Sequence, residues 1–132
     1  MPESVYLPAA AADAILAHAW RDVPHEACGL LIGTVLTVTR LAPTANADDS
    51  ATRYTIPAAQ HFAAIRQARS DGLEVIGAYH SHPRSEAVPS PTDTATAFPG
   101  FVFVIAGLVP QPQLRAWHLV DGNFVELRLV RT

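Results

Sequence analysis

The sequence has one cysteine, Cys28, and a formal net charge of only -3 over its 132 residues. A single thiol cannot form an internal disulfide, so the fold does not depend on oxidation, which fits a reducing compartment. The 9 Lys and Arg residues lie scattered along the chain and form no basic stripe. Because nucleic-acid-binding domains usually carry such a stripe, we expect no nucleic-acid partner.

Long apolar runs are missing as well. The alanine-rich stretch from Pro8 to Trp20 is interrupted by Asp13 and His18, and it is shorter than the roughly 20 apolar residues that span a bilayer. The first four residues, Met-Pro-Glu-Ser, show no basic region followed by an apolar stretch, so we expect no signal peptide. The sequence therefore favours a soluble, cytoplasmic protein with no membrane partner.

The composition is that of a globular protein. Hydrophobic residues make up 49% of the chain and charged residues 16%, and the length suits one domain that buries its own core. We therefore expect residues 1–132 to form a single domain.

Hydrophobic patterns and turn signals predict an alternation of helices and strands. Helices are expected at residues 7–21 and 58–70, and strands at residues 29–40 (one strand or a pair), 53–56, 73–79, 101–105, 114–120 and 124–130. Residues 80–91 are expected to form a loop that ends at a helix start, Ser90-Pro91-Thr92-Asp93. This order predicts an α/β or α+β domain with one central sheet between helices.

Several residues are expected in the core. We place Trp20 and Trp117 there, and the helix expected at residues 58–70 carries Phe62, Ile65 and Ala68 on or near one face.

Two histidines and an aspartate have the spacing of a metal site. Residues two apart in an extended chain point to the same side, so His80 and His82 can reach one ion. Asp93 can supply a third ligand if the intervening loop folds back. Three protein ligands of this kind leave the fourth position of a zinc ion for water, as in catalytic sites. Hydrolysis would still need a base to move protons, and Glu26 is the candidate.

The pattern His-x-His, seven residues, Ser-x-x-Asp resembles, without a gap, the motif of the JAMM (MPN-plus) zinc metallopeptidase family. Glu26, followed by the apolar residues 28–33, is similar to that family's glutamate and the strand after it, and the resemblance runs from about Val23 to Gly107. It implies a cytidine-deaminase-like α/β fold, with a central mixed sheet flanked by helices. It also implies one zinc ion and peptidase or isopeptidase activity of a deubiquitinase-like kind.

The resemblance assigns a role to each matching residue. His80, His82 and Asp93 would be the zinc ligands, Glu26 the general acid and base, and Ser90 a stabiliser of the developing oxyanion. Compact single-domain members of the family resemble enzymes that trim small sulfur-carrier or ubiquitin-fold proteins. We therefore expect a ubiquitin-like or sulfur-carrier β-grasp protein as the substrate partner.

Simpler interpretations remain open. Ser90 could be only a helix cap, Asp93 only a charge at a helix N-terminus, and Glu26 a surface residue. Cys28 is most simply a small buried residue, although a thiol beside the zinc is an alternative.

Other functions are also weighed. A non-catalytic zinc-binding scaffold or sensor of the same fold is the main alternative. A nucleobase deaminase would need Pro-Cys-x-x-Cys, which one cysteine excludes. The sequence leaves the oligomeric state open.

Overall fold

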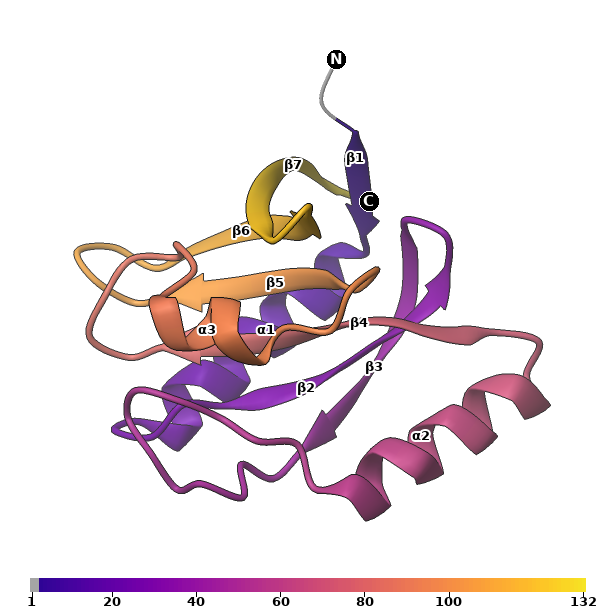
Figure 1. Cartoon of the computed structure of the whole chain (residues 1–132), viewed down its shortest axis with the longest axis horizontal. Coiled ribbons are helices and arrows are strands. Elements are labelled where there is room, and N and C mark those ends of the chain that lie inside the picture. Colours follow the sequence, from indigo (N-terminus) through magenta and orange to yellow (C-terminus); the bar gives the residue numbers. More distant parts are fainter. Residues whose placement is uncertain (1–2) are drawn as a thin grey trace.

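The computed structural model describes residues 3–132, apart from the side chains of residues 94–96. Over this range the strands are β1 (Ser4–Leu7), β2 (Cys28–Thr34), β3 (Thr37–Thr44), β4 (Glu74–His82), β5 (Val102–Gly107), β6 (Gln113–Val120) and β7 (Asn123–Arg131). The helices are α1 (Ala9–Asp22), α2 (Ala58–Ser70) and α3 (Pro91–Thr96). Figure 1 shows the strands as one strongly curved sheet with the helices outside it.

The sheet is mixed and closes on itself. Its strands are ordered β1-β3-β2-β4-β5-β6-β7, and β7 pairs with β1 to complete the closure. The β4–β5 pair is parallel, as are the pairs that β1 makes, whereas the remaining pairs are antiparallel. The mixed sheet with flanking helices confirms the expected fold class, and closure is an additional feature.

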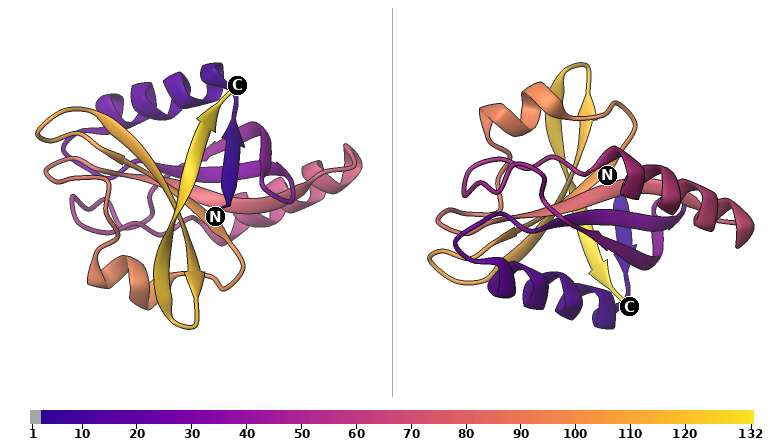
Figure 2. Two further views of the ribbon diagram at one scale, coloured as in Figure 1. Left: turned by 90° about the horizontal axis from the view of Figure 1, so that it is seen from above. Right: turned by 90° about the horizontal axis from the view of Figure 1, so that it is seen from below.

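Each face of the β2–β4 region packs against a different helix. Ile15 of α1 belongs to a core cluster with Leu31 and Tyr79, whereas Ala68 of α2 belongs to a cluster with Leu30 and Ala78. Neighbouring residues of a strand point to opposite faces, so the two clusters lie on either side of the sheet. In Figure 2, α1 and α3 also lie on opposite sides of it. None of the described helices is both long and apolar enough to cross a membrane.

Some of the predicted elements differ from those observed. Residues 53–56 form no strand, and β4 continues through His82, so the histidines belong to a strand rather than to the loop. The short strand β1 was not predicted. Its alternation is too brief to detect, although Val5 and Leu7 are fully buried. Their burial against the other strands comes from tertiary pairing, which a four-residue pattern does not reveal.

Trp20 was expected in the core but is exposed, and Phe62 of the second helix is exposed as well. Trp20 is 54% exposed because the buried positions of α1 include Ala12, Ile15 and Ala19, which places Trp20 off that face. Phe62 is 61% exposed, since the buried stripe of α2 runs through Ala68 and misses it. Trp117 is buried, as expected.

The close approach of β4 and β5 at Gly77 provides a test of the fold. A Cβ atom at this position would overlap the carbonyl oxygen of Val102. We expect Gly77→Ala to lower the free energy of unfolding by about 1–3 kcal/mol, measured by urea denaturation, because the two strands must move apart. Gly72→Ala is the control, since its Cβ would meet no atom within 4 Å and only its φ of +73° opposes the change. Equal losses, or a smaller loss for Gly77→Ala, would contradict the packing described.

Candidate metal centre

The side chains of His80, His82 and Asp93 converge on one point, and we call them the candidate metal group. The Nε2 atoms of His80 and His82 lie 3.2 Å apart. The Oδ2 atom of Asp93 lies 3.2 Å from the first and 3.0 Å from the second. All three residues are buried. The structure therefore brings together the three side chains that the spacing predicted as ligands.

The two histidines occupy the end of β4. They are two residues apart in an extended strand, so both imidazoles leave the same face, the one that also carries Ala78. Parallel pairing with β5 aligns His80 with Ile105 and His82 with Gly107. This pairing fixes the backbone from which both imidazoles project.

Asp93, the third member of the candidate metal group, is presented by the first turn of α3. Ser90 caps this helix: its Oγ accepts the N–H of Asp93 at 3.1 Å, and its own N–H donates to Asp93 Oδ2 at 2.9 Å. Pro91 follows at the first helical position, where its fixed φ favours the turn. This capping box turns the Asp93 carboxylate toward the imidazoles, and the interpretation of Ser90 as a cap is confirmed.

The three atoms have the separations expected of metal ligands. Zinc bonds of about 2.0–2.1 Å at tetrahedral angles hold ligand atoms about 3.3 Å apart. The observed separations of 3.0–3.2 Å are close to this value. Two imidazole nitrogens and one carboxylate oxygen are also a common donor set for divalent ions, so the group could hold one.

Burial and neighbouring groups together set the pKa of each residue in the candidate metal group. Burial opposes ionisation of Asp93, but hydrogen bonds from His80 and His82 outweigh it and hold the pKa of Asp93 far below its usual range. Burial also opposes the charged form of His82. Its pKa is nevertheless raised, by Asp93 and by the carbonyl of Glu86. Burial lowers the pKa of His80. The Asp93 carboxyl is thus held in its ionised form, the form in which a carboxylate can bind a metal ion.

The two imidazoles have different surroundings. His82 Nδ1 lies 2.8 Å from the carbonyl oxygen of Glu86, to which it can donate, leaving Nε2 to act as a ligand. The ring of His80 instead stacks on Tyr54, with centroids 4.4 Å apart and planes at 21°. The Nδ1 atom of His80 has no hydrogen-bond partner among the described residues. The imidazole of His82 is therefore oriented by a hydrogen bond, and that of His80 by an aromatic face.

Glu26 lies between α1 and β2 and is 2% exposed, so its interpretation as a surface residue is wrong. Its Oε1 atom has no partner among the described residues. Burial raises the pKa of Glu26 to about 8, while the charge of His82 lowers it and that of Asp93 raises it. The carboxyl is thus within electrostatic reach of the candidate metal group. A carboxyl with a pKa near neutrality suits proton transfer.

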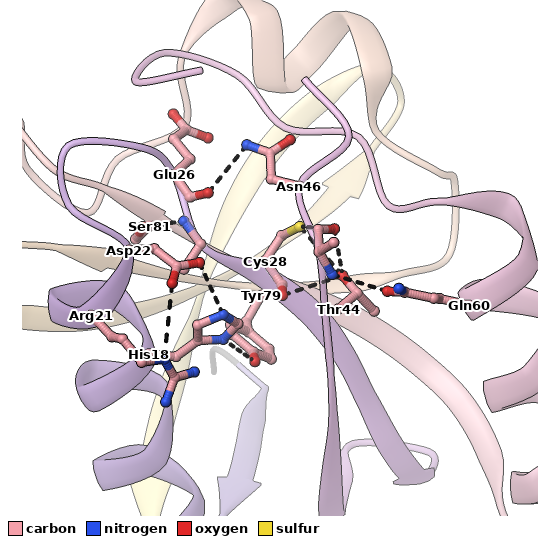
Figure 3. A network of polar contacts seen from close by, with 12 residues as sticks. His18, Arg21, Asp22, Glu26, Cys28, Thr44, Asn46, Gln60, Tyr79 and Ser81 are labelled. Carbon is pink, nitrogen blue, oxygen red and sulfur yellow. Dashed lines mark hydrogen bonds and ion pairs between the residues drawn. The ribbon is translucent and has the colours of Figure 1, made fainter. Parts of the chain in front are cut away.

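Cys28 is a buried structural residue. Its Sγ lies 3.4 Å from Thr44 Oγ1 and donates to the carbonyl of Ala45 at 3.3 Å (Figure 3). Burial raises the pKa of this thiol to about 11, which keeps it protonated near neutral pH. Cys28 is also outside the candidate metal group. The interpretation as a small buried residue is confirmed.

An apolar cavity of about 390 Å³ adjoins the metal group. Ala78 lines it from the same face of β4 as His80, and Tyr54 lines it while stacking on the His80 ring. The exposed rings of Phe62 and Phe98 also line the cavity. The sequence did not predict Tyr54 as part of this region, because no motif or spacing links residue 54 to residue 80.

Comparisons with known proteins agree with this geometry. Residues 8–120 match the family model described as prokaryotic homologs of the JAB domain. A desampylase from Haloferax volcanii is 36% identical over 129 residues, covering 92% of this chain and 91% of that protein. A CysO-cysteine peptidase from Mycobacterium tuberculosis is 37% identical over 120 residues, covering 86% of this chain and 82% of that protein.

Solved structures are similar over nearly the whole chain. A protein from Desulfitobacterium hafniense superimposes with a TM-score of 0.88 at 28% identity, covering 97% of this chain and 92% of its own. A JAB1/MPN domain protein from Archaeoglobus fulgidus shares the fold, with a TM-score of 0.60, 21% identity and 97% of each chain covered. The resemblance to the JAMM/MPN-plus family is confirmed, and this chain belongs to the family of prokaryotic homologs of the JAB domain.

Proposed function

We propose that this chain is a zinc-dependent peptidase. It hydrolyses an amide or isopeptide bond at the carboxyl terminus of a ubiquitin-like or sulfur-carrier protein with a β-grasp fold. The observation that carries the proposal is the convergence of the side chains of His80, His82 and Asp93, two of which act electrostatically on the buried carboxyl of Glu26. In this proposal residues 1–132 act as one domain in the cytoplasm, where a fold with one unpaired thiol is compatible with reducing conditions.

His80, His82 and Asp93 would hold the ion. When bound, zinc supplies Lewis acidity that activates water and polarises the scissile carbonyl. Glu26 takes up the proton that the attacking water loses and returns it to the departing amine. Its raised pKa fits it to hold a proton for this interval near neutral pH.

Ser90 has two compatible roles in this proposal. A hydroxyl can accept one hydrogen bond and donate another. Ser90 Oγ accepts the capping bond from the backbone of Asp93. It would stabilise the oxyanion that develops on the scissile carbonyl by donating its hydroxyl proton. The cap then helps position the same hydroxyl for catalysis.

The substrate class rests on relatives and on the surface beside the site. The two relatives are named as a desampylase and a CysO-cysteine peptidase, which supports a small carrier or modifier protein as substrate. The apolar cavity next to His80 offers a contact for the folded part of such a protein while its tail reaches the metal. Phe62 and Phe98 would form this contact.

Replacing the proposed base tests the mechanism. We expect Glu26→Gln to bind zinc as the unaltered protein does but to hydrolyse substrate about 100- to 10,000-fold more slowly, because no carboxylate accepts the proton. Mass spectrometry of β-grasp proteins with carboxyl-terminal extensions, before and after incubation, measures the cleavage. Full hydrolysis by Glu26→Gln would exclude the proposed role.

Metal removal tests the cofactor. We expect a chelator to abolish cleavage and added zinc to restore it, with one zinc ion per chain in the active protein, measured by elemental analysis. Asp93→Asn should bind zinc at least about 10-fold more weakly, because it loses the carboxylate ligand. A protein that stays active without stoichiometric metal would contradict the proposal.

The buried carboxyl also predicts how the stability of the metal-free protein depends on pH. The folded-state pKa of Glu26 is raised from 4.5 to about 8, so folding favours the protonated form. The stability that this preference adds to the folded state is fully present below pH 4.5 and is lost as the pH rises to about 8. Glu26→Gln cannot lose that proton. Its free energy of unfolding relative to the unaltered protein should therefore rise across this window, by up to about 5 kcal/mol. Urea denaturation at several pH values checks this, and a constant difference would be the contrary result.

A further inference from the structure

Glu26 precedes His80 by more than fifty residues, and the antiparallel pairing of β2 with β4 brings them together. The last paired residues of the ladder are Cys28 and His80. One step further, the N–H of Ser81 donates to the carbonyl of Ala27 at 3.0 Å. The N–H of Ala27, however, donates to the side-chain hydroxyl of Ser81 at 2.8 Å. The hydroxyl thus takes the place that a backbone carbonyl would have in a regular pair.

The backbone of Glu26 is held from the other side by the 46–55 segment. Its carbonyl accepts a hydrogen bond from Asn46 Nδ2 at 3.1 Å, drawn in Figure 3, and its N–H donates to the carbonyl of Ser50 at 2.7 Å. The backbone N–H and C=O groups of both Glu26 and Ala27 are therefore hydrogen-bonded. None of these bonds uses the carboxyl group of Glu26.

The Asn46 side chain connects two parts of the site. Besides the carbonyl of Glu26, its Nδ2 donates to the carbonyl of Arg53 at 3.0 Å. Its Oδ1 accepts the N–H of Thr55 at 3.1 Å. These bonds hold the backbone on either side of Tyr54, the residue that stacks on His80. One carboxamide thereby fixes both the segment that carries Glu26 and the aromatic face behind a proposed ligand.

We propose that the Ser81 hydroxyl and the Asn46 carboxamide are positioning groups for Glu26, and we call the pair the Glu26 clamp. The inference rests on the proposed function, in which Glu26 moves protons. The clamp fixes the backbone of residues 26–27 against β4 on one side and the 46–55 segment on the other. No described residue hydrogen-bonds the Oε1 atom of Glu26, and the carboxyl stays within electrostatic reach of the candidate metal group.

The two members of the clamp are not ligands themselves. Ser81 points to the face of β4 opposite His80 and His82 because neighbouring strand residues alternate. Its loss should therefore leave the three ligands in place and displace the base. Misplacing a catalytic group by about 1 Å can cost about 100-fold in rate.

The test compares Ser81→Ala, Ser81→Thr and Asn46→Ala in the zinc-loaded protein, with the cleavage assay used for Glu26→Gln. We expect Ser81→Ala and Asn46→Ala to lower kcat about 10- to 100-fold, and Ser81→Ala to keep zinc affinity within about threefold of the unaltered protein, since Ser81 lies on the face of β4 opposite the proposed ligands. Ser81→Thr keeps the Oγ acceptor and should recover most of the rate. Ser70→Ala and Asn123→Ala, at exposed positions, are the matched controls.

A second measurement does not depend on turnover. Hydrogen exchange of the Ala27 amide, followed by NMR in the metal-free protein, should be slow in the unaltered protein and in Ser81→Thr. It should be faster in Ser81→Ala, where the acceptor is missing. If Ser81→Ala does not fold, Asn46→Ala and Ser81→Thr still test the clamp, because Asn46 is only partly buried.

The outcomes separate the two proposals. If Glu26→Gln is inactive while Ser81→Ala and Asn46→Ala keep full activity, the clamp is refuted and the proposed function stands. In Ser81→Ala, zinc affinity falling in parallel with kcat would also overturn the clamp, since the hydroxyl would then act through the ligands. If Glu26→Gln is as active as the unaltered protein, the proposed function itself fails.

Discussion

The candidate site depends on one buried carboxylate oxygen, Asp93 Oδ2, which is shared by two imidazoles and one backbone amide. An ionised carboxylate away from water is costly unless partners compensate its charge. Here the compensation comes from β4, which supplies both histidines, and from the N-terminus of α3, which supplies the Ser90 N–H. A divalent cation would satisfy the same carboxylate more fully. One charge therefore links two consecutive elements, the end of β4 and the start of α3, across the loop between them.

This requirement explains how the loop between the two elements is held. The carbonyl of Glu86 faces His82 Nδ1, and the carbonyl of Ala87 accepts the indole N–H of Trp117 at 3.0 Å. Gly107 at the end of β5 permits the loop backbone to approach where a Cβ would collide with Ala87. The loop is thus anchored largely through its backbone, and the buried side chain of Ala87 packs with Ile105 and Trp117. Buried Trp117, whose indole needs a partner, links this loop to β6.

Local patterns were sufficient to predict most of the fold and the convergence of His80, His82 and Asp93. The spacing from His80 to Asp93 lies within one strand–loop–helix unit, and Ser90 signals the helix start. Features that depend on long-range packing were not accessible in this way. Strand β1 is buried by pairing with β7, and Tyr54 reaches His80 across a segment without regular structure. The burial of Glu26, which raises its pKa, likewise comes from surrounding elements rather than from its neighbours in sequence.

The alternation along β4 separates chemistry from support. Ala78, His80 and His82 share one face, which carries the apolar cavity and the metal group. On the opposite face, the hydroxyl of Tyr79 lies 2.7 Å from His18 Nδ1 of α1, and Ser81 holds the backbone beside Glu26 (Figure 3). A shift of one residue in the pairing of β4 would exchange its two faces, so that each set of side chains would lie on the wrong side of the sheet. The strand register that fills the core therefore also assembles the site, so selection for packing and selection for chemistry act on the same pairing.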